Sequence, residues 1–408
     1  MTLFTNHRAS VPSPARRRFV AAAAALLVTP VAAAGVPARP APLAAPAAPD
    51  TAADYRRLLV LVELKGGNDG FNTLVPYADP LYRTLRPRLA IARDAIVQLS
   101  DRAGLHPALA PLLPLWQARE LALIEGVSYP DPNLSHFRSI EIWNTASRSD
   151  QYMSKGWLTR TFEAFATPSR FAADGFVIGS YDLGPLEGGA RALTIANPAQ
   201  LEHHASLVSD HGSAHTEALA HILTVEADIV RAATRFRPER TFATAFPANP
   251  FGNVVRSACE VVGGASGVAA LKLTLNGFDT HVDQLARQAR LLDELAQGLV
   301  ALRAGLVELG RWDDTLVLTY AEFGRRPHEN ASAGTDHGTA NVHFALGGRV
   351  AGGLHGATPS LDRLGPDGNP VPTVDFRSVY ATVLERWWNV DSRGVLGGRF
   401  ATLPFVRA

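Results

Sequence analysis

Acidic and histidine residues follow several apolar segments of this chain, close to the point where each segment ends. The apolar segments lie at 57–64, 271–275 and 315–320, and a shorter one lies at 342–346. Carboxylate and imidazole groups are the ligands that Zn²⁺ and Mn²⁺ take in proteins, and enough of them can hold two ions. The residues in these positions are Asp69, Asp279, His281, Glu322, Asp336, His337 and His343.

A second group of polar residues follows the apolar segment at 121–124 after a Pro/Asn-rich loop. It contains Ser135, His136 and Arg138, at the start of a predicted helix over 136–145. A serine at this position can also serve only as the helix cap. An arginine such as Arg138 can equally be an ordinary surface charge.

The apolar segments alternate with stretches of helical periodicity, which predicts an α/β protein with a mostly parallel sheet. Helices are expected over 105–117, 213–236, 283–309 and 375–388, and a polar loop over 322–339. In parallel sheets, ligands bind outside the carboxyl ends of the strands. The acidic and histidine residues therefore belong to one edge of the predicted sheet.

Each of these short patterns also has an ordinary structural interpretation. Asp69 can be a turn residue, and Asp279 can cap a helix with His281 left in solvent. The tripeptide Asp-His-Gly at 336–338 is a stronger pattern, but the chain contains a second copy at 210–212. Because that copy follows no strand and lies in a His-rich polar stretch, we interpret it as solvated surface.

The first residues of the chain resemble an export signal of the twin-arginine type. Arg16 and Arg17 are followed by one residue and then by Phe19 and Val20, at the start of an Ala-rich apolar run. This run is too short for a membrane span, which needs roughly 20 residues. We expect residues 1–38 to be a signal peptide that the twin-arginine translocase reads, which predicts a periplasmic or secreted protein with no stable membrane anchor.

The rest of the chain is expected to be an Ala/Pro-rich tether over 39–53 and a single domain over 54–408. The whole chain has 39 Lys and Arg against 38 Asp and Glu; residues 1–38 hold four arginines and no acid, which leaves 35 against 38, or −3. Such a balance argues against nucleic acid as a partner. Cys259 is the one cysteine, which excludes an internal disulfide and a thiolate zinc cluster.

Several motifs in order resemble the bacterial domain of unknown function 1501, a family whose members are often exported by the twin-arginine route. The resemblance extends over residues 55 to 405. Its segments are 66–70 (Gly-Gly-Asn-Asp-Gly), 131–139 (Asp-Pro-Asn-Leu-Ser-His-Phe-Arg-Ser), 277–281 (Gly-Phe-Asp-Thr-His), 322–326 (Glu-Phe-Gly-Arg-Arg), 334–338 (Gly-Thr-Asp-His-Gly) and 375–380 (Asp-Phe-Arg-Ser-Val-Tyr).

That family is similar to the alkaline phosphatase and sulfatase superfamily, which implies a three-layer α/β/α fold with a metal site at the strand ends. The resemblance implies Ser135 as nucleophile and a divalent ion, most simply Zn or Mn. The chain departs from the superfamily in spacing Asp279 and His281 as Asp-x-His instead of Asp-x-x-x-His. The ligands that it implies are Asp69, Asp279, His281, Asp336, His337 and His343, with Glu322 either a further ligand or a group behind one.

The hypothesis that follows is an exported metal-dependent hydrolase of phosphate or sulfate esters, acting on a small-molecule ester. Ser135 would attack phosphorus or sulfur, and Arg138 would hold a non-bridging oxygen. The alternatives are a non-catalytic exported binding or assembly protein that retains the fold, and another metal-assisted transfer on the same fold.

Overall fold

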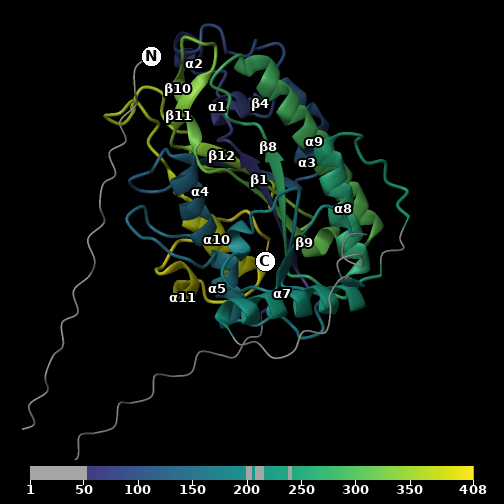
Figure 1. Cartoon of the computed structure of the whole chain (residues 1–408). Helices are drawn as coiled ribbons and strands as arrows, with labels where there is room; N and C mark the ends of the chain where they lie inside the picture. The colour runs from purple at the N-terminus through teal and green to yellow at the C-terminus, as the bar shows by residue number, and fades with distance from the viewer. Residues whose placement is uncertain (1–52, 199–204, 207–215, 238–240, 408) are drawn as a thin grey trace, which may run out of the picture. The chain divides into compact units, whose positions relative to one another are not determined.

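A nine-stranded sheet lies at the centre of the described chain (Figure 1). The computed structural model describes residues 53–198, 205–206, 216–237 and 241–407. The strands follow the order β13-β5-β12-β9-β1-β8-β6-β7, and β14 pairs with β5. They are β1 (Leu58–Lys65), β5 (Leu121–Ser128), β6 (Gly175–Ile178), β7 (Ala192–Ile195), β8 (Ala270–Asn276), β9 (Thr315–Tyr320), β12 (Asn341–Leu346), β13 (Gly353–Gly356) and β14 (Val374–Asp375).

The sheet is mostly parallel, as the sequence predicts. Within it, β12 runs antiparallel to both of its neighbours, β5 and β9, and the other paired strands are parallel. Lys65 of β1 pairs with Asn276 of β8, and Glu63 of β1 pairs with Tyr320 of β9. The carboxyl ends of these three strands therefore meet at the same edge.

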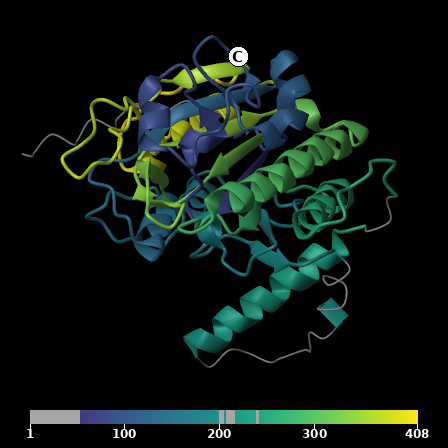
Figure 2. The same ribbon diagram turned by 90° about the horizontal axis from the view of Figure 1, so that it is seen from above.

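A layer of helices covers each face of the sheet. The central strand β1 is apolar on both faces and contributes residues to both cores. Leu58, Val60 and Val62 belong to one core, and Leu59 and Leu61 to the other, since successive strand residues point to opposite faces. Figures 1 and 2 show α8 and the long α9 beside the first face; α4, α5 and α10 cover the second. These helices are α4 (His136–Thr145), α5 (Trp157–Ala164), α8 (Pro250–Gly264), α9 (Gln284–Glu308) and α10 (Phe376–Thr382).

Shorter elements connect these layers. Two small sheets accompany the central one: β2 (Leu74–Val75), β3 (Val97–Gln98) and β4 (Gly104–Leu105) form the first, and β10 (Gly324–Glu329) with β11 (Thr335–Gly338) the second. The other helices are α1 (Gly70–Thr73), α2 (Pro80–Leu85), α3 (Leu113–Gln117), α7 (Glu217–Thr234) and α11 (Arg393–Leu396); the 3₁₀ turns η1 (Pro107–Leu112), η2 (Gly184–Leu186) and η3 (Trp312–Asp314); and η4, a π-helical turn at Val383–Trp387.

Three sequence predictions about elements need correction. The helix expected over 105–117 is a 3₁₀ turn followed by the short α3, because Pro111 and Pro114 cannot donate the hydrogen bonds of a continuous α-helix. The polar loop expected over 322–339 contains the antiparallel hairpin of β10 and β11. The helix expected over 375–388 changes from α to π geometry at Val383.

Some predictions fall outside the described residues. These are the signal peptide at 1–38, the tether at 39–53 except its last residue, and the second Asp-His-Gly copy at 210–212. Among the described residues, no helix is both long enough and apolar enough to cross a membrane.

Candidate metal centre

Loops from several strand ends meet at the carboxyl edge of β1, β8 and β9. The chain leaves these strands after Lys65, Asn276 and Tyr320. β5 reaches the same edge, and a loop over 129–135 then leads into α4. The hairpin of β10 and β11 follows β9 directly. This is the place where the sequence predicts the polar residues to gather.

Asp279 is surrounded by three histidines at this edge. Its Oδ1 lies 3.0 Å from Nε2 of His281 and 3.2 Å from Nε2 of His337, and its Oδ2 lies 3.4 Å from Nε2 of His136. The Nε2 atoms of His281 and His337 are 2.9 Å apart. We call these four residues the His/Asp cluster.

Each imidazole of the cluster has an oxygen atom beside its other ring nitrogen. Nδ1 of His136 lies 2.8 Å from Oε1 of Glu322, and Nδ1 of His337 lies 2.9 Å from the carbonyl oxygen of Leu134. Nδ1 of His281 lies 3.6 Å from Oδ1 of Asp336. For His136 and His337 the acceptor at Nδ1 places the proton there and leaves Nε2 with a lone pair, which is how proteins orient metal-binding histidines. The Asp336 carboxylate is too far from His281 for a hydrogen bond.

The spacing of the cluster fits a metal ion. With bonds of about 2.0–2.1 Å, the ligand atoms of a tetrahedral zinc ion lie about 3.3 Å apart. The nitrogen and oxygen atoms of Asp279, His281 and His337 are separated by 2.9–3.2 Å. One atom each of His136, Asp279 and His337 lie within 4.8 Å of one another. The described residues therefore contain a possible His/Asp metal site.

Arg325 holds the loops that carry the cluster. This side chain is fully buried, and its Nη2 donates to Oδ1 of Asp279 at 2.8 Å. Its Nε donates to the carbonyl of Gly67 at 2.7 Å and its Nη1 to that of Thr335 at 2.9 Å. Gly66 completes the junction: its φ is +117°, and a Cβ there would lie 2.3 Å from the backbone nitrogen of Asp279.

The environment keeps Asp279 and His337 in forms that bind cations. Partial burial raises the pKa of Asp279, but hydrogen bonding and charge from Arg325, with His337 and His281, outweigh it and hold that pKa below its usual value. Burial lowers the pKa of His337. An ionised carboxylate and a neutral imidazole are the ligating forms, and these two shifts favour them. The hydrogen bond to Glu322 has the opposite effect on His136, because it raises the pKa of that imidazole and so favours its protonated form.

Ser135 lies beside the cluster at the first turn of α4. Its neighbours on both sides take part: the Leu134 carbonyl accepts from His337, and His136 is a cluster member. The Ser135 side chain is exposed and makes no capping hydrogen bond to the helix. The loop before it is fixed by Tyr129, whose hydroxyl accepts from the backbone nitrogen of Asn133 at 3.1 Å.

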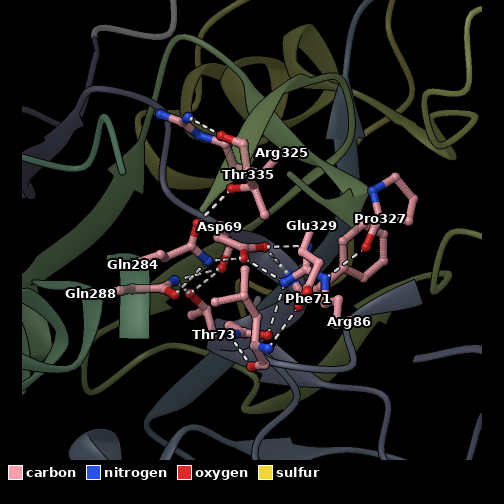
Figure 3. A network of polar contacts seen from close by, with 12 residues as sticks. Asp69, Phe71, Thr73, Arg86, Gln284, Gln288, Arg325, Pro327, Glu329 and Thr335 are labelled. Atoms are coloured by element: carbon pink, nitrogen blue, oxygen red, sulfur yellow. Dashed lines mark hydrogen bonds and ion pairs between the residues drawn. The ribbon is translucent and has the colours of Figure 1, made fainter. Parts of the chain in front are cut away.

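Asp69, which the sequence predicts as a ligand, lies in a separate buried network (Figure 3). Arg86 contacts both of its carboxylate oxygens, at 2.5 Å and 3.1 Å. The backbone nitrogen of Phe71 donates to Oδ1 at 3.1 Å, and Gln284 Nε2 donates to Oδ2 at 2.5 Å. Each oxygen thus has two protein donors, which leaves the carboxylate no position for an ion.

The Asp69 network is nevertheless connected by hydrogen bonds to the two loops that carry the cluster. Oε1 of Gln284 accepts hydrogen bonds from Oγ1 of Thr335 at 2.6 Å and from Oγ1 of Thr280 at 3.1 Å. Thr280 separates Asp279 from His281, and Thr335 precedes the Asp336-His337 pair. By holding Gln284, Asp69 therefore helps to fix the positions of the two segments that carry Asp279, His281 and His337.

Glu322 and Asp336, two further predicted ligands, lie behind histidines of the cluster. Glu322 is buried, and its Oε1 accepts from the backbone nitrogen of Gly66 at 3.0 Å as well as facing His136. Asp336 accepts from Nδ2 of Asn330 at 3.2 Å. Of the two roles left open for Glu322, its contacts favour the one behind a ligand.

Arg138, predicted to hold a substrate oxygen, is buried and engaged elsewhere. Its Nη2 donates to the carbonyls of Ser149 and Gln151 at 3.0 Å and 2.7 Å, and its Nη1 lies 2.9 Å from Glu141. The guanidinium also lies over the ring of Tyr152, 3.8 Å from its centre. These contacts hold the loop after α4 and engage the guanidinium away from the His/Asp cluster.

His343, the last predicted ligand, lies within the core. It is fully buried in β12 against the ring of Trp143, and neither of its ring nitrogens has a hydrogen-bond partner among the described residues. Burial lowers the pKa of His343 to about 3. It does not join the His/Asp cluster.

His136 is the cluster residue that the predicted ligand set omits. The sequence does place it after a strand, beside Ser135, which is the same signal that pointed to Asp279 and His281. The interpretations of Ser135 as a helix cap or a nucleophile give no role to its neighbour. A histidine at the first position of a helix that starts at a sheet's carboxyl edge is the pattern to look for.

The structure is similar at low identity to several solved structures. One is a protein in the alkaline phosphatase superfamily from Vibrio parahaemolyticus, at 10% identity and a TM-score of 0.41, covering 84% of this chain and 69% of that chain. Another is the C-terminal periplasmic domain of EcEptC from Escherichia coli in complex with Zn, at 10% identity and a TM-score of 0.34, covering 71% and 72%. A third is the phosphonate monoester hydrolase of Agrobacterium radiobacter, at 10% identity and a TM-score of 0.35, covering 84% and 78%.

No curated protein matches the chain. A family model does match, over residues 111–393, and its description is a protein of unknown function, DUF1501. The match covers Ser135 and the whole His/Asp cluster, and it confirms the resemblance seen in the sequence motifs: the chain belongs to the DUF1501 family.

Proposed function

We propose that this protein is an exported metal-dependent hydrolase of phosphate or sulfate esters. The ion would be held by His136, Asp279, His281 and His337, and Ser135 would be the nucleophile. Glu322 and the Leu134 carbonyl would orient the imidazoles of His136 and His337. Asp69 would support this centre without touching the ion.

One observation carries the proposal: three Nε2 atoms face one carboxylate, and two of the three imidazoles have a hydrogen-bond acceptor at Nδ1. Histidines that lie only in solvent would not need such acceptors. Three nitrogen ligands with one carboxylate oxygen suit Zn²⁺ first and Mn²⁺ next. When bound, such an ion polarises a phosphoryl or sulfuryl oxygen and lowers the pKa of a coordinated hydroxyl.

The role of Ser135 follows from its place next to His136 and from its exposed side chain, which makes no capping hydrogen bond. Its Oγ would form a bond to phosphorus or sulfur as the bond to the substrate alcohol breaks, and the serine proton would leave with that alcohol. Water would then cleave the serine ester, releasing phosphate or sulfate and restoring the hydroxyl. Arg325 would keep Asp279 ionised and in place throughout, since its other donors are fixed to backbone carbonyls.

The test is the Ser135→Ala variant of the mature protein, loaded with Zn²⁺ or Mn²⁺ and assayed on phosphate and sulfate mono- and diesters. We expect ester hydrolysis to fall by at least about a thousandfold, since a lost nucleophile costs several orders of magnitude in rate. Bound metal, measured by elemental analysis, should stay at the wild-type level. The melting temperature should also stay, because Ser135 makes no capping hydrogen bond whose loss would cost about 1 kcal/mol.

A lower melting temperature with retained hydrolysis would show instead that Ser135 is a structural residue. Thr73 is not a substitute nucleophile, because it is buried and its hydroxyl donates to the Asp69 carbonyl at 2.7 Å.

A second function, a non-catalytic exported binding or assembly protein with a structural ion, is favoured by one observation. Asp69, His343 and Arg138, all predicted for a two-metal hydrolase, do not join the cluster, so a second ion has no ligand set of the predicted kind. Turnover decides between the two functions: wild-type protein with metal bound that cleaves none of the esters would be such a binding protein.

Export by the twin-arginine translocase is part of the proposal and rests on the sequence at Arg16 and Arg17. Replacing both arginines with lysine should retain the precursor in the cytoplasm. An unchanged amount of protein outside the cytoplasm would overturn this part and leave the proposed chemistry untouched.

A further inference from the structure

Arginines gather at the amino edge of the central sheet, opposite to the edge that carries the His/Asp cluster. Arg56 and Arg57 directly precede β1, and Arg119 lies just before β5. Arg311 lies just before β9, and its Nη2 donates to the carbonyl of Arg56 at 2.9 Å. Because β12 runs antiparallel to β5 and β9, it ends at this same edge, and Arg349 follows it. The topology of the sheet thus brings arginines from separate segments to one edge.

Two further arginines, from the last part of the chain, join them through hydrogen bonds. Nη1 of Arg57 donates to the carbonyl of Arg386 at 3.3 Å. Nη2 of Arg407 donates to the carbonyl of Arg119 at 2.9 Å. The backbone nitrogen of Arg407 donates to the carbonyl of Arg349, also at 2.9 Å. We call this set the arginine edge; its members are Arg56, Arg57, Arg119, Arg311, Arg349, Arg386 and Arg407.

Few carboxylates offset the positive charge of the arginine edge. Asp54 lies 3.0 Å from Arg56 and 3.3 Å from Arg57. Asp314 lies 3.8 Å from Arg349. Across the described ranges of the chain, the arginines of this edge with no carboxylate at ion-pair distance are Arg119, Arg311, Arg386 and Arg407. Their charges are therefore available to an anionic partner.

The other acids close to this edge leave it positive. Asp313 lies beside Asp314 in the turn before β9, and Glu120 is engaged by Arg303 at 2.5 Å. Next to Arg386, acids and further arginines balance one another; they are Glu385, Asp391, Arg393 and Arg399. Residues 39–408 together carry a net negative charge. The arginine edge thus differs in sign from the chain as a whole, which marks it as a surface for a partner of negative charge.

A hollow of about 220 Å³ lies at the arginine edge. Arg386 and Arg407 line it together with a hydroxyl residue and three apolar ones, which are Thr402, Leu403, Pro404 and Val406. A guanidinium group pairs with phosphate oxygens through parallel hydrogen bonds. Guanidinium groups beside apolar side chains suit the headgroup region of an anionic phospholipid, where phosphate adjoins hydrocarbon.

We propose that the arginine edge binds the surface of a membrane that contains anionic phospholipids, with a lipid phosphate in this hollow. The path of the chain favours a membrane over other polyanions. The backbone nitrogen of Asp54 donates to the carbonyl of Trp388 at 3.0 Å, so the domain begins at this edge. The expected tether over 39–53 can span no more than about 50 Å even when fully extended. The expected signal peptide is therefore attached at the edge that would meet the lipid.

Binding through the arginine edge would also orient the protein. β1 contains 8 residues and rises about 3.3 Å per residue, so its two ends lie roughly 26 Å apart. With the arginine edge on the membrane, the His/Asp cluster would face the aqueous phase at the other end of this strand. The proposal does not depend on ester hydrolysis, because it concerns a surface that is separate from the cluster.

Co-sedimentation of the mature protein with phospholipid vesicles tests the proposal. We expect binding to vesicles of mixed phosphatidylglycerol and phosphatidylcholine, and none to vesicles of phosphatidylcholine alone. Salt at about 1 M should release the protein, because it shortens the screening length to about 3 Å. The double variant Arg386→Gln, Arg407→Gln should weaken binding by about fivefold for each arginine, the factor that one basic residue contributes near an anionic surface.

The matched control is Arg148→Gln, Arg363→Gln, which makes the same change in net charge elsewhere on the molecule. Both side chains are exposed, at 68% and 86%. The carbonyl of Arg148 accepts from Arg138 of α4, and Arg363 follows the carboxyl end of β13. This variant should keep the wild-type binding to the mixed vesicles.

Equal binding to both kinds of vesicle, binding to neither, or an equal loss in the two double variants would overturn the proposal. Inorganic phosphate at the concentration of the lipid phosphate should displace little protein. Complete displacement would show that the edge binds a free anion, which also overturns it. Should the melting temperature of Arg386→Gln, Arg407→Gln fall, the pair Arg56→Gln, Arg349→Gln takes its place, since those side chains are 82% and 43% exposed.

Discussion

Asp69 and Asp279 are the same residue type in equivalent places, yet the structure uses them differently. Each follows a parallel strand of the central sheet, β1 for Asp69 and β8 for Asp279, and the two strands are neighbours. Asp69 has no exposed side-chain surface and has two donors on each oxygen. Asp279 is 46% exposed, is held on one side by Arg325, and faces three imidazoles.

In the proposed centre, position at a strand end would not by itself make a metal ligand. What would decide is whether the protein's own donors already fill the oxygen lone pairs. Arg86, Gln284 and the backbone nitrogen of Phe71 fill those of Asp69, so its charge stabilises the loops. The second oxygen of Asp279 faces the unprotonated Nε2 of His136 and accepts from no donor among the described residues, so its charge would remain available to an ion.

The isosteric pair Asp69→Asn and Asp279→Asn tests this comparison, and its largest expected effect is on stability. In Asp69→Asn, an amide NH₂ replaces an oxygen that accepts from two donors, and buried Arg86 loses its counter-charge. We expect the free energy of unfolding to fall by about 3–5 kcal/mol, the usual cost of breaking a buried ion pair. Urea denaturation with a chelator present measures the protein's own stability.

Asp279→Asn is the matched variant with the opposite outcome. Its remaining oxygen can still accept from Arg325 and the carboxylate is partly solvated, but buried Arg325 loses a counter-charge. Stability under the same conditions should therefore fall, by less than in Asp69→Asn. Metal affinity should fall by more than about a hundredfold, because the loss of a direct ligand should exceed the cost of an outer-shell change. The comparison breaks if Asp69→Asn stays stable and loses metal, because Asp69 would then be a ligand as the sequence predicts.

Much of the fold follows from the sequence because its central strands are continuous apolar runs. β9 and α4 have the predicted bounds, 315–320 and 136–145, and β1 and β8 differ from theirs by a residue at the ends. The errors lie in segments where the spacing of apolar residues does not reflect the backbone conformation. The apolar spacing over 105–117 looks helical, but its prolines impose a 3₁₀ turn, and the hairpin of β10 and β11 carries too few apolar residues to look like strands.

Part of the candidate centre was predictable from the rule that ligands bind at the carboxyl ends of parallel strands. Asp279, His281 and His337 follow from that rule, and His136 fits it too. The rule cannot exclude Asp69, because the groups that fill its carboxylate are Arg86, 17 residues away, and Gln284, 215 residues away. Nor can it exclude His343, which lies on a strand whose direction is reversed in the sheet.

His343 extends the comparison to histidines, with a smaller expected effect. In the part of the chain that the structure describes, its buried ring has no hydrogen-bond partner, whereas His136 and His337 have an acceptor at Nδ1. The variant His343→Phe keeps an aromatic ring at this position and removes two unpaired nitrogens. We therefore expect unchanged bound metal and, at pH 7, stability equal to or above that of the wild type, since an unpaired buried polar group costs about 1–3 kcal/mol.

The depressed pKa of His343 also predicts how the stability of the wild-type protein changes as the pH falls. The pKa of His343 is about 3 in the folded protein against 6.5 for an unperturbed histidine, so the unfolded chain takes up its proton first as the pH falls. Stability linked to this group is complete above pH 6.5 and is lost progressively toward pH 3. Between pH 6.5 and 5 the loss is about 2 kcal/mol, and His343→Phe should abolish that share of the acid sensitivity. Urea denaturation of both proteins at pH 7, 6 and 5, with a chelator present, measures it. Two parallel stability curves would mean that His343 is hydrated or paired in the folded protein, and loss of metal in the variant would restore His343 to the ligand set.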